Sequence, residues 1–266
     1  MSTSTSNESD LTIAVEHREK VLWVDLQRPD VLNAINRAMV DDLHRMVDRA
    51  EQSDVRAVVI RGTGRAFCAG ADLHQVPGQQ IDIDLLRETV DEVAKVIDRI
   101  ASLPKPVIAG VHGVAAAGGL EIVLACDIVV ATRDARFADA HSNYGLLPGG
   151  RGSVRLPRLV GAALAKRLMF TGEFVTPSEL VASGLVAAVV EPEELDDHLH
   201  RLAGHLTERS PRVLAAMKRL VDGSHQLSAT ESADAEEAAL GEYLRTPDLK
   251  EGLTAFREGR QPRFDD

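Results

Sequence analysis

The first 140 residues alternate between two patterns of apolar positions. Short apolar runs rich in β-branched residues are typical of buried strands. They lie at 11–16, 21–26, 57–61, 107–111, 127–131 and 136–138. Between these runs, apolar residues at helical spacing predict helices at 37–53, 83–103 and 119–125. Strands that alternate with helices in this way indicate an α/β core.

Beyond residue 150 the pattern changes to helices. The predicted helices lie at 153–160, 162–170, 177–183, 194–210, 211–223 and 232–244, and one strand lies at 185–190. We place the core at 11–207 and a C-terminal helical region at 208–266, with a packing boundary near 207–213. Residues 1–10 are rich in Ser and Thr and lack the apolar stretch of a secretory signal, so we expect a disordered leader there.

Size and charge limit the class of protein. The 266 residues suit one large domain with an ample core. Acidic residues outnumber basic ones by 41 to 30, which gives a formal net charge of −11. This surplus argues against a nucleic-acid partner, because such a partner needs a basic surface. It does not exclude coenzyme A, because a few local basic groups are enough to meet its phosphates.

Cysteine use and hydropathy bear on the cellular compartment. The two cysteines, Cys68 and Cys126, are interpreted as small buried thiols and imply no disulfide framework. No apolar run approaches the roughly 18 residues that a membrane span needs. We therefore expect a cytoplasmic protein with no membrane partner.

Two glycine-bearing stretches are the most informative part of the chain. They are 64–73 (GRAFCAGADL) and 113–121 (GVAAAGGLE), and each follows a β-branched apolar run. Glycine lets bare backbone approach a ligand closely, and a helix start supplies unpaired N–H donors and a positive dipole end. Two such turns that face each other can hold one thioester oxygen and stabilise it as an enolate. This favours acyl-CoA chemistry.

Further motifs follow one another in a recognisable order. They are RPDVLNAIN at 28–36, AGADL at 69–73, GGLE at 118–121, CDI at 126–128, GLLPGG at 145–150, RLPRLVG at 155–161, TG at 171–172, GLV at 184–186, Phe256, and RQPRF at 260–264. Together they resemble the crotonase superfamily, also called the enoyl-CoA hydratase/isomerase family, over nearly the whole chain.

The resemblance implies both a fold and a site. The fold is an α/β spiral of repeated β-β-α units, followed by an α-helical region that builds homotrimers or dimers of trimers. The substrate is an acyl-CoA thioester, and its oxygen would accept hydrogen bonds from the main-chain N–H groups of Ala71 and Gly118. Residues matching the family's substrate-binding and coenzyme A-binding positions are Arg28, Val31, Ala34, Ala69, Gly70, Asp72, Leu73, Gly119, Tyr144 and Phe264.

Three of these binding positions carry more specific expectations. Arg28 is a candidate contact for the coenzyme A phosphates, whereas Asp30 stands where the family often has a basic residue. Asp72 is expected to tie down its turn through main-chain N–H groups. Tyr144 is expected to pack in the core or in the wall of the acyl pocket.

Two side chains are candidates for acid–base chemistry. Glu121 lies three residues after Gly118, one helical turn along, so it can stand over the oxyanion donors. A carboxylate in an apolar cleft has its pKa raised by desolvation, which suits proton exchange near neutral pH. The resemblance places His141 where hydratases carry a second glutamate. Histidine also does acid–base work, and Asp139 can orient it if a strand places both side chains on one face.

Metal, phosphate-loop and serine-nucleophile signals are missing from the sequence. His74 and His112 stand alone, and the histidines within 198–205 lack a metal-binding frame. The glycine-rich segment 149–152 lacks the Lys-Ser/Thr ending of a phosphate loop and is interpreted as a pocket turn before a helix. No Gly-x-Ser-x-Gly elbow is present. We expect no metal and no cofactor, with coenzyme A as part of the substrate.

The leading hypothesis is reversible hydration of a 2-enoyl-CoA. Ala71, Gly118, Glu121 and His141 would be the catalytic residues. Because His141 departs from the family pattern, two alternatives stay open. One is a delta-3,delta-2-enoyl-CoA isomerase or another enolate-forming lyase or hydrolase, and the other is a catalytically silent acyl-CoA-binding protein.

Overall fold

The computed structural model describes residues 11–75 and 82–264, so the expected leader at 1–10 lies outside the described residues. A six-stranded sheet forms the centre of the molecule, in the order β1-β2-β3-β4-β6-β8. Its strands are β1 (Ile13–Arg18), β2 (Val21–Leu26), β3 (Ala57–Gly62), β4 (Val107–Val111), β6 (Ile128–Thr132) and β8 (Ala188–Val190). β1 and β2 form an antiparallel pair, and every later pair is parallel. β5 (Val114–Ala116) and β7 (Arg136–Ala138) form a separate parallel pair.

Both faces of the sheet are covered. Alternation along β2 sends Leu22 and Val24 into the cluster that contains the buried side chains of α1 (Arg37–Ala50). Trp23 points to the other face, where it joins the cluster formed with α7 (Leu195–Thr207). Burial on both faces is why the central strands are almost continuously apolar.

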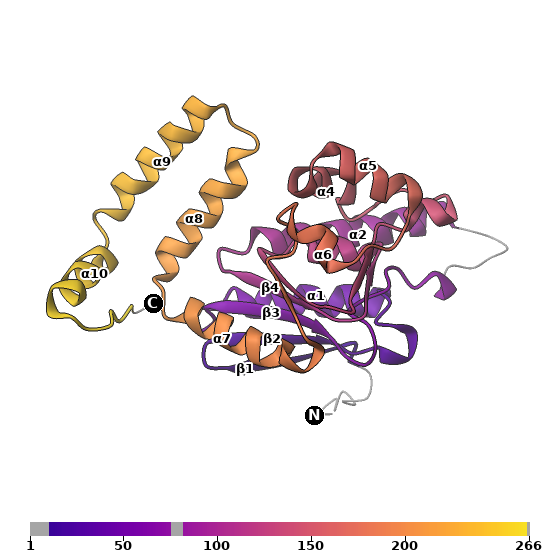
Figure 1. The fold of residues 1–266 in the computed structure, drawn as a ribbon, viewed down its shortest axis with the longest axis horizontal. Helices are drawn as coiled ribbons and strands as arrows, with labels where there is room; N and C mark the ends of the chain where they lie inside the picture. Colours follow the sequence, from indigo (N-terminus) through magenta and orange to yellow (C-terminus); the bar gives the residue numbers. More distant parts are fainter. Residues whose placement is uncertain (1–10, 76–81, 265–266) are drawn as a thin grey trace, which may run out of the picture.

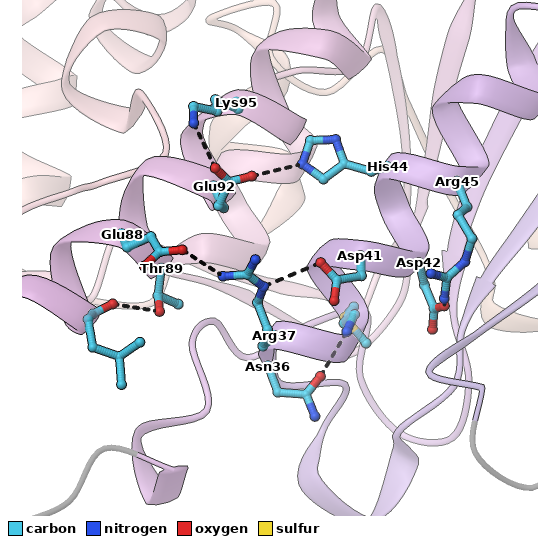
Figure 2. A network of polar contacts seen from close by, with 12 residues as sticks. Asn36, Arg37, Asp41, Asp42, His44, Arg45, Glu88, Thr89, Glu92 and Lys95 are labelled. Carbon is cyan, nitrogen blue, oxygen red and sulfur yellow. Dashed lines mark hydrogen bonds and ion pairs between the residues drawn. The ribbon is translucent and has the colours of Figure 1, made fainter.

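Polar contacts join α1 to α2 (Ile83–Ser102), as Figure 2 shows. Arg37 lies 3.7 Å from the Glu88 carboxylate, and His44 Nε2 lies 3.6 Å from Glu92. Glu92 also accepts a 2.7 Å hydrogen bond from Lys95 on its own helix. Pairs this exposed each add little stability. They link α1 to the first half of α2, whereas the buried residues of α2 all lie in its second half.

A second helical layer packs beside α2. It consists of α4 (Gly152–Val160), α5 (Ala162–Thr171) and α6 (Pro177–Val181), and α4 and α5 pack against each other. The short α3 (Gly118–Val123) is completely buried between these elements and the sheets. Within the described residues, no helix combines the length and apolar character required to span a bilayer.

Three helices extend away from the sheet after α7 (Figure 1): α8 (Pro211–Ser224), α9 (Ala229–Tyr243) and α10 (Pro247–Glu258). Lys218 Nζ on α8 lies 2.8 Å from Asp127 beside β6, which ties this region to the core. Arg212 lies 2.6 Å from the buried carboxylate of Asp248, which joins α8 to α10. The architecture is a mixed α/β core with a C-terminal helical region, so the predicted fold class is confirmed.

Candidate active site

The two glycine-bearing turns lie against each other. Cys68 N donates to Val114 O over 3.0 Å, and Ala116 N donates to Cys68 O over 2.9 Å. These bonds hold the segment after β3 alongside β5 and bring Gly70 to the start of α3. A methyl group placed on Gly70 would lie 3.3 Å from Gly118 N. One placed on Gly119 would lie only 2.1 Å from Cys68 O, so the close approach requires glycine there.

The main-chain N–H groups of Ala71 and Gly118 have no acceptor among the described residues. Their neighbours are engaged: Gly70 O accepts from Ile35 N, and Asp72 N donates to Ile35 O. Gly118 is the first residue of α3, where an N–H has no acceptor one turn earlier. Ala71 is exposed to solvent. Two free donors from separate segments are therefore adjacent, as the oxyanion hypothesis requires.

Glu121 stands on α3 with only 3% of its surface exposed. Its Oε1 atom accepts hydrogen bonds from Gly150 N over 2.8 Å and Gly152 N over 2.9 Å. Burial raises the pKa of this carboxyl, whereas the two N–H bonds and the nearby His141 lower it, and the net shift is upward. A buried carboxylate with a raised pKa and fixed geometry suits proton exchange near neutral pH.

His141 and Asp139 form a buried pair beside Glu121. His141 Nδ1 lies 3.1 Å from Asp139 Oδ1, and the two residues are 8% and 2% exposed. Burial disfavours the imidazolium, but the hydrogen bond and charge of Asp139, together with the charge of Glu121, outweigh it and raise the pKa of His141. Because Nδ1 donates to the carboxylate, Nε2 is the ring nitrogen left for a substrate.

The chain matches one family in sequence and in structure. Residues 16–266 match the model of the enoyl-CoA hydratase/isomerase family. The chain belongs to this family. The short-chain-enoyl-CoA hydratase of Clostridium acetobutylicum is 35% identical to it, covering 94% of this chain and 95% of the relative. The crotonyl-CoA hydratase of Syntrophomonas wolfei is 33% identical, covering 95% and 97%. The crystal structure of enoyl-CoA hydratase from Bacillus anthracis superimposes with a TM-score of 0.91 at 30% identity, covering 95% and 98%.

Arg28 and Asp72 form an ion pair with each other that the sequence did not predict. The Arg28 guanidinium lies 2.9 Å from Asp72 Oδ2 and also donates to Ala34 O. Both side chains are largely buried, so Arg28 is used to tie the turn at Pro29–Val31 to the segment after Ala71. The expected phosphate contact of Arg28 stays a prediction, because a guanidinium has five N–H donors and the Asp72 and Ala34 contacts do not use them all. Asp72 contacts the arginine, and among the described residues no main-chain N–H group donates to its carboxylate.

Several other predicted binding residues surround the two free donors. Ala69 N donates to Leu32 O over 3.0 Å, which joins the first turn to the residues near Val31 and Ala34. Ala34 is buried, whereas Val31 and Leu73 are 39% and 45% exposed. Leu73 is on the segment that carries Gly70 and Ala71, and Val31 is on the turn at Pro29–Val31.

Tyr144 lies in the same short turn as His141 and is 73% exposed, so it does not pack in the core; its place in the wall of the acyl pocket stays a prediction. Phe264 O accepts a hydrogen bond from Arg56, which directly precedes β3. The site lies beyond the other end of β3, so Phe264 of the same chain is not part of it.

Sequence reasoning missed the main-chain contacts of Gly150 and Gly152. Their segment was interpreted as a turn, and its two amides hold Glu121. A methyl group on Gly150 would lie 2.6 Å from Glu121 Oε2, which is the physical reason for glycine at that position. Cys68 is buried as predicted, and burial raises its pKa to about 12, whereas Cys126 is only partly buried. Among residues 11–75 and 82–264, no three His, Cys, Asp or Glu side chains gather in a metal-binding group.

Proposed function

We propose that this protein catalyses the reversible hydration of a 2-enoyl-CoA thioester. One observation carries the proposal: two free main-chain donors lie beside a buried carboxyl and a buried imidazole whose pKa values are both raised. The hydratases among its relatives support the same reaction.

The two amides act on the thioester oxygen. The N–H groups of Ala71 and Gly118 donate to it and stabilise the negative charge that the oxygen gains when the enolate forms. In other enzymes the loss of one such donor costs about 2.7–4 kcal/mol of transition-state stabilisation. The same polarisation makes the β-carbon electrophilic, so no metal or redox cofactor is needed.

Glu121 and His141 handle the protons. The Glu121 carboxylate takes a proton from water while the water oxygen bonds to the β-carbon, and the π electrons move onto the thioester oxygen. The His141 imidazolium then gives a proton to the α-carbon, which regenerates the carbonyl. Glu121 ends protonated and His141 neutral, so exchange of one proton between the two groups through solvent restores the site. The reaction thus requires Glu121 ionised and His141 charged at the outset.

Turnover of crotonyl-CoA tests the proposal. We expect the wild type to hydrate this substrate and Glu121→Gln to be slower by about 10²–10⁴-fold, the usual contribution of a positioned acid–base group. Glutamine keeps an oxygen for the amides of Gly150 and Gly152, so the loop stays in place. Equal rates in the two proteins would show that Glu121 is not the base.

Two alternative functions are outcomes of the same assay. Conversion of a 3-enoyl-CoA into the 2-enoyl isomer, without hydration, would assign the isomerase reaction. Tight binding of acyl-CoA thioesters with no turnover of any of them would identify a silent binding protein. His141→Glu places the family's usual residue in the site, and a large gain in hydration rate in this variant would contradict the role given to His141.

The proposed assembly is a homotrimer or a dimer of trimers. Large apolar side chains are exposed on the C-terminal helices at Met217, Val221, Leu240, Leu244, Leu253 and Phe256. Apolar surface of this kind is typical of a subunit interface. The position of Phe264, at the end of β3 away from its own site, supports a role for it in a neighbouring subunit's site.

A further inference from the structure

Asp98, on α2, holds two arginines of the neighbouring segment. Its Oδ2 atom lies 3.0 Å from Arg151 Nε, and its Oδ1 atom lies 3.0 Å from Arg155 NH2. Both oxygens of the carboxylate are therefore used. Arg155 Nε is buried and has no hydrogen-bond partner within the described part of the chain, so the Asp98 contact is what orients its guanidinium.

Arg151 lies between the two residues whose amides hold Glu121. Gly150 N and Gly152 N both donate to Glu121 Oε1, and the backbone of Arg151 determines how the second amide is turned relative to the first. Arg151 has a φ of 75°, in the left-handed region that a non-glycine residue rarely adopts. Such conformations persist only where the surrounding structure enforces them.

The other contacts of this loop with α2 are apolar. Methyl groups placed on Gly149 and Gly150 would meet Val90 and Ile97 at 2.5 Å, so the loop lies directly against that helix. Packing fixes the distance of the loop from the helix. The ion pairs of Asp98 add the direction in which Arg151 must point.

We propose that Asp98 is a positioning residue, which holds the loop 150–152 through Arg151 and Arg155 so that both amides stay on Glu121. The inference rests on the proposed function, in which Glu121 exchanges protons with water and substrate. The Asp98 carboxylate contacts Arg151 and Arg155, so it would act on Glu121 only through the loop.

The direction in which the pKa of Glu121 changes when Asp98 is replaced distinguishes this positioning role from a direct effect of the Asp98 charge. The groups that face Glu121 are the side chains of Asp139 and His141, which directly follow β7, and the main-chain amides of Gly150 and Gly152. Asp98→Asn removes a negative charge, and a direct electrostatic effect would lower the pKa of Glu121. Release of the loop would weaken two N–H bonds that favour the carboxylate, and would raise that pKa instead.

The test is a ¹³C NMR titration of the full-length protein with labelled glutamate, in which Glu121 is assigned from Glu121→Gln. We expect Asp98→Asn to raise the pKa of Glu121 by about one unit. The acidic limb of kcat/KM should move upward by the same amount. Asp48→Asn is the matched control, because Asp48 pairs at 2.6 Å with Arg99, the next residue of α2, and we expect it to change neither measurement.

A second variant protects the test against a failure of Asp98→Asn to fold. Asp98→Glu keeps the charge but moves the carboxylate by one methylene, so we expect a smaller rise in the same direction. A pKa that is unchanged or lowered in both variants would overturn the proposal. Because NMR reads Glu121 directly, a raised pKa in a protein without hydratase activity would refute the proposed function and leave the role of Asp98 standing.

Discussion

At the scale of single residues, Glu121 makes the native state less stable at neutral pH. Its pKa is raised from a model-peptide value of 4.5, chiefly by burial. The native state therefore binds this proton more tightly than the unfolded chain does. Stability is lost as the pH rises from 4.5 through the folded pKa, and the loss is complete above it. This cost is typical of a site kept for function.

Replacement of Glu121 by glutamine should therefore separate stability from activity. The amide carries no charge to desolvate and keeps an acceptor for the two glycine amides. We expect Glu121→Gln to have a higher Tm than the wild type at pH 7 and the same Tm near pH 4, measured by calorimetry. A lower Tm at pH 7 would show that the two N–H bonds outweigh burial in the wild type.

The carboxylate of Asp139 acts on both of its neighbours in the same direction. Its charge raises the pKa of His141, against the effect of burial, and it also contributes to the rise at Glu121. Since hydration requires Glu121 ionised and His141 protonated, kcat/KM should follow a bell-shaped curve bounded by these two groups.

Asp139→Asn is expected to move that whole curve to lower pH. The alkaline limb shifts because the imidazolium loses its partner, and the acidic limb shifts because the carboxylate loses a repelling charge. The raised pKa of His141 also stabilises the fold at pH values below 6.5, the ordinary pKa of histidine, and this gain is lost as the pH rises through the folded pKa. NMR titration of His141 gives an independent readout. An unchanged alkaline limb would mean that His141 is not the group that must be protonated.

At the scale of elements, the contact between α3 and the first turn depends on the absence of a side chain. Gly119→Ala would place a methyl group 2.1 Å from Cys68 O, a main-chain atom that cannot move aside alone. We expect a loss of about 1–3 kcal/mol in the free energy of unfolding, typical of overpacking. Separation of Ala71 from Gly118 should also lower kcat. Urea unfolding and steady-state kinetics measure the two effects.

Gly204 in α7 provides the matched control for this substitution. Among the described residues, no heavy atom outside its chain neighbours and the backbone of its own helix lies within 4 Å of the position that its Cβ would take, and the residue sits inside a helix. Gly204→Ala should stabilise the protein by about 0.5–1 kcal/mol, the difference in helix propensity. If Gly119→Ala were equally well tolerated, the close approach of the two turns would not be required.

Local pattern was sufficient for most elements and for part of the site. The β-branched runs predicted the central strands, and the N-cap side chain of Asn36 explains why α1 begins at Arg37. α10 was missed, and Gly252 in its interior weakens the helical pattern of this segment. β5 was missed because its residues, Val114–Ala116, fall inside the second glycine-bearing stretch, which was interpreted as a turn. Strand 185–190 was predicted too long, since only Ala188–Val190 pairs with β6.

Pairings between distant residues were not readable from the sequence. The Arg28–Asp72 contact joins residues 44 positions apart, and nothing local to Arg28 distinguishes it from a phosphate-binding arginine. The Asp139–His141 pair was expected from alternation along a strand. It arises instead from a turn, because Ala140 between them has a φ of 59°. Glu121 was found from its spacing to Gly118, but its two donors lie 29 and 31 residues away.

At the scale of the whole molecule, the C-terminal helices have few buried side chains of their own. Nothing on α8 is buried, and only Ala239 on α9 is. Isolated helices of this length are marginal in water, so most of their stability must come from packing. Their exposed apolar side chains therefore support the proposed assembly, in which other copies of the chain supply that packing.

Phe256 provides the sharpest test, because it is 85% exposed on α10. If this surface is solvent-exposed in the functional protein, Phe256→Asp should change the free energy of unfolding by less than about 0.5 kcal/mol and leave the mass unchanged. If copies of the chain bury it, each copy loses about 1.5–3 kcal/mol of contact. The assembly should then dissociate toward the 28.7 kDa chain in sedimentation velocity. Lys250→Gln on the same helix makes the net charge more negative by the same one unit at an exposed polar position, and we expect it to leave the assembly intact. Hydratase activity should fall with the assembled fraction if Phe264 completes the site of a neighbouring copy. Full activity in a dissociated Phe256→Asp protein would restrict the site to one chain.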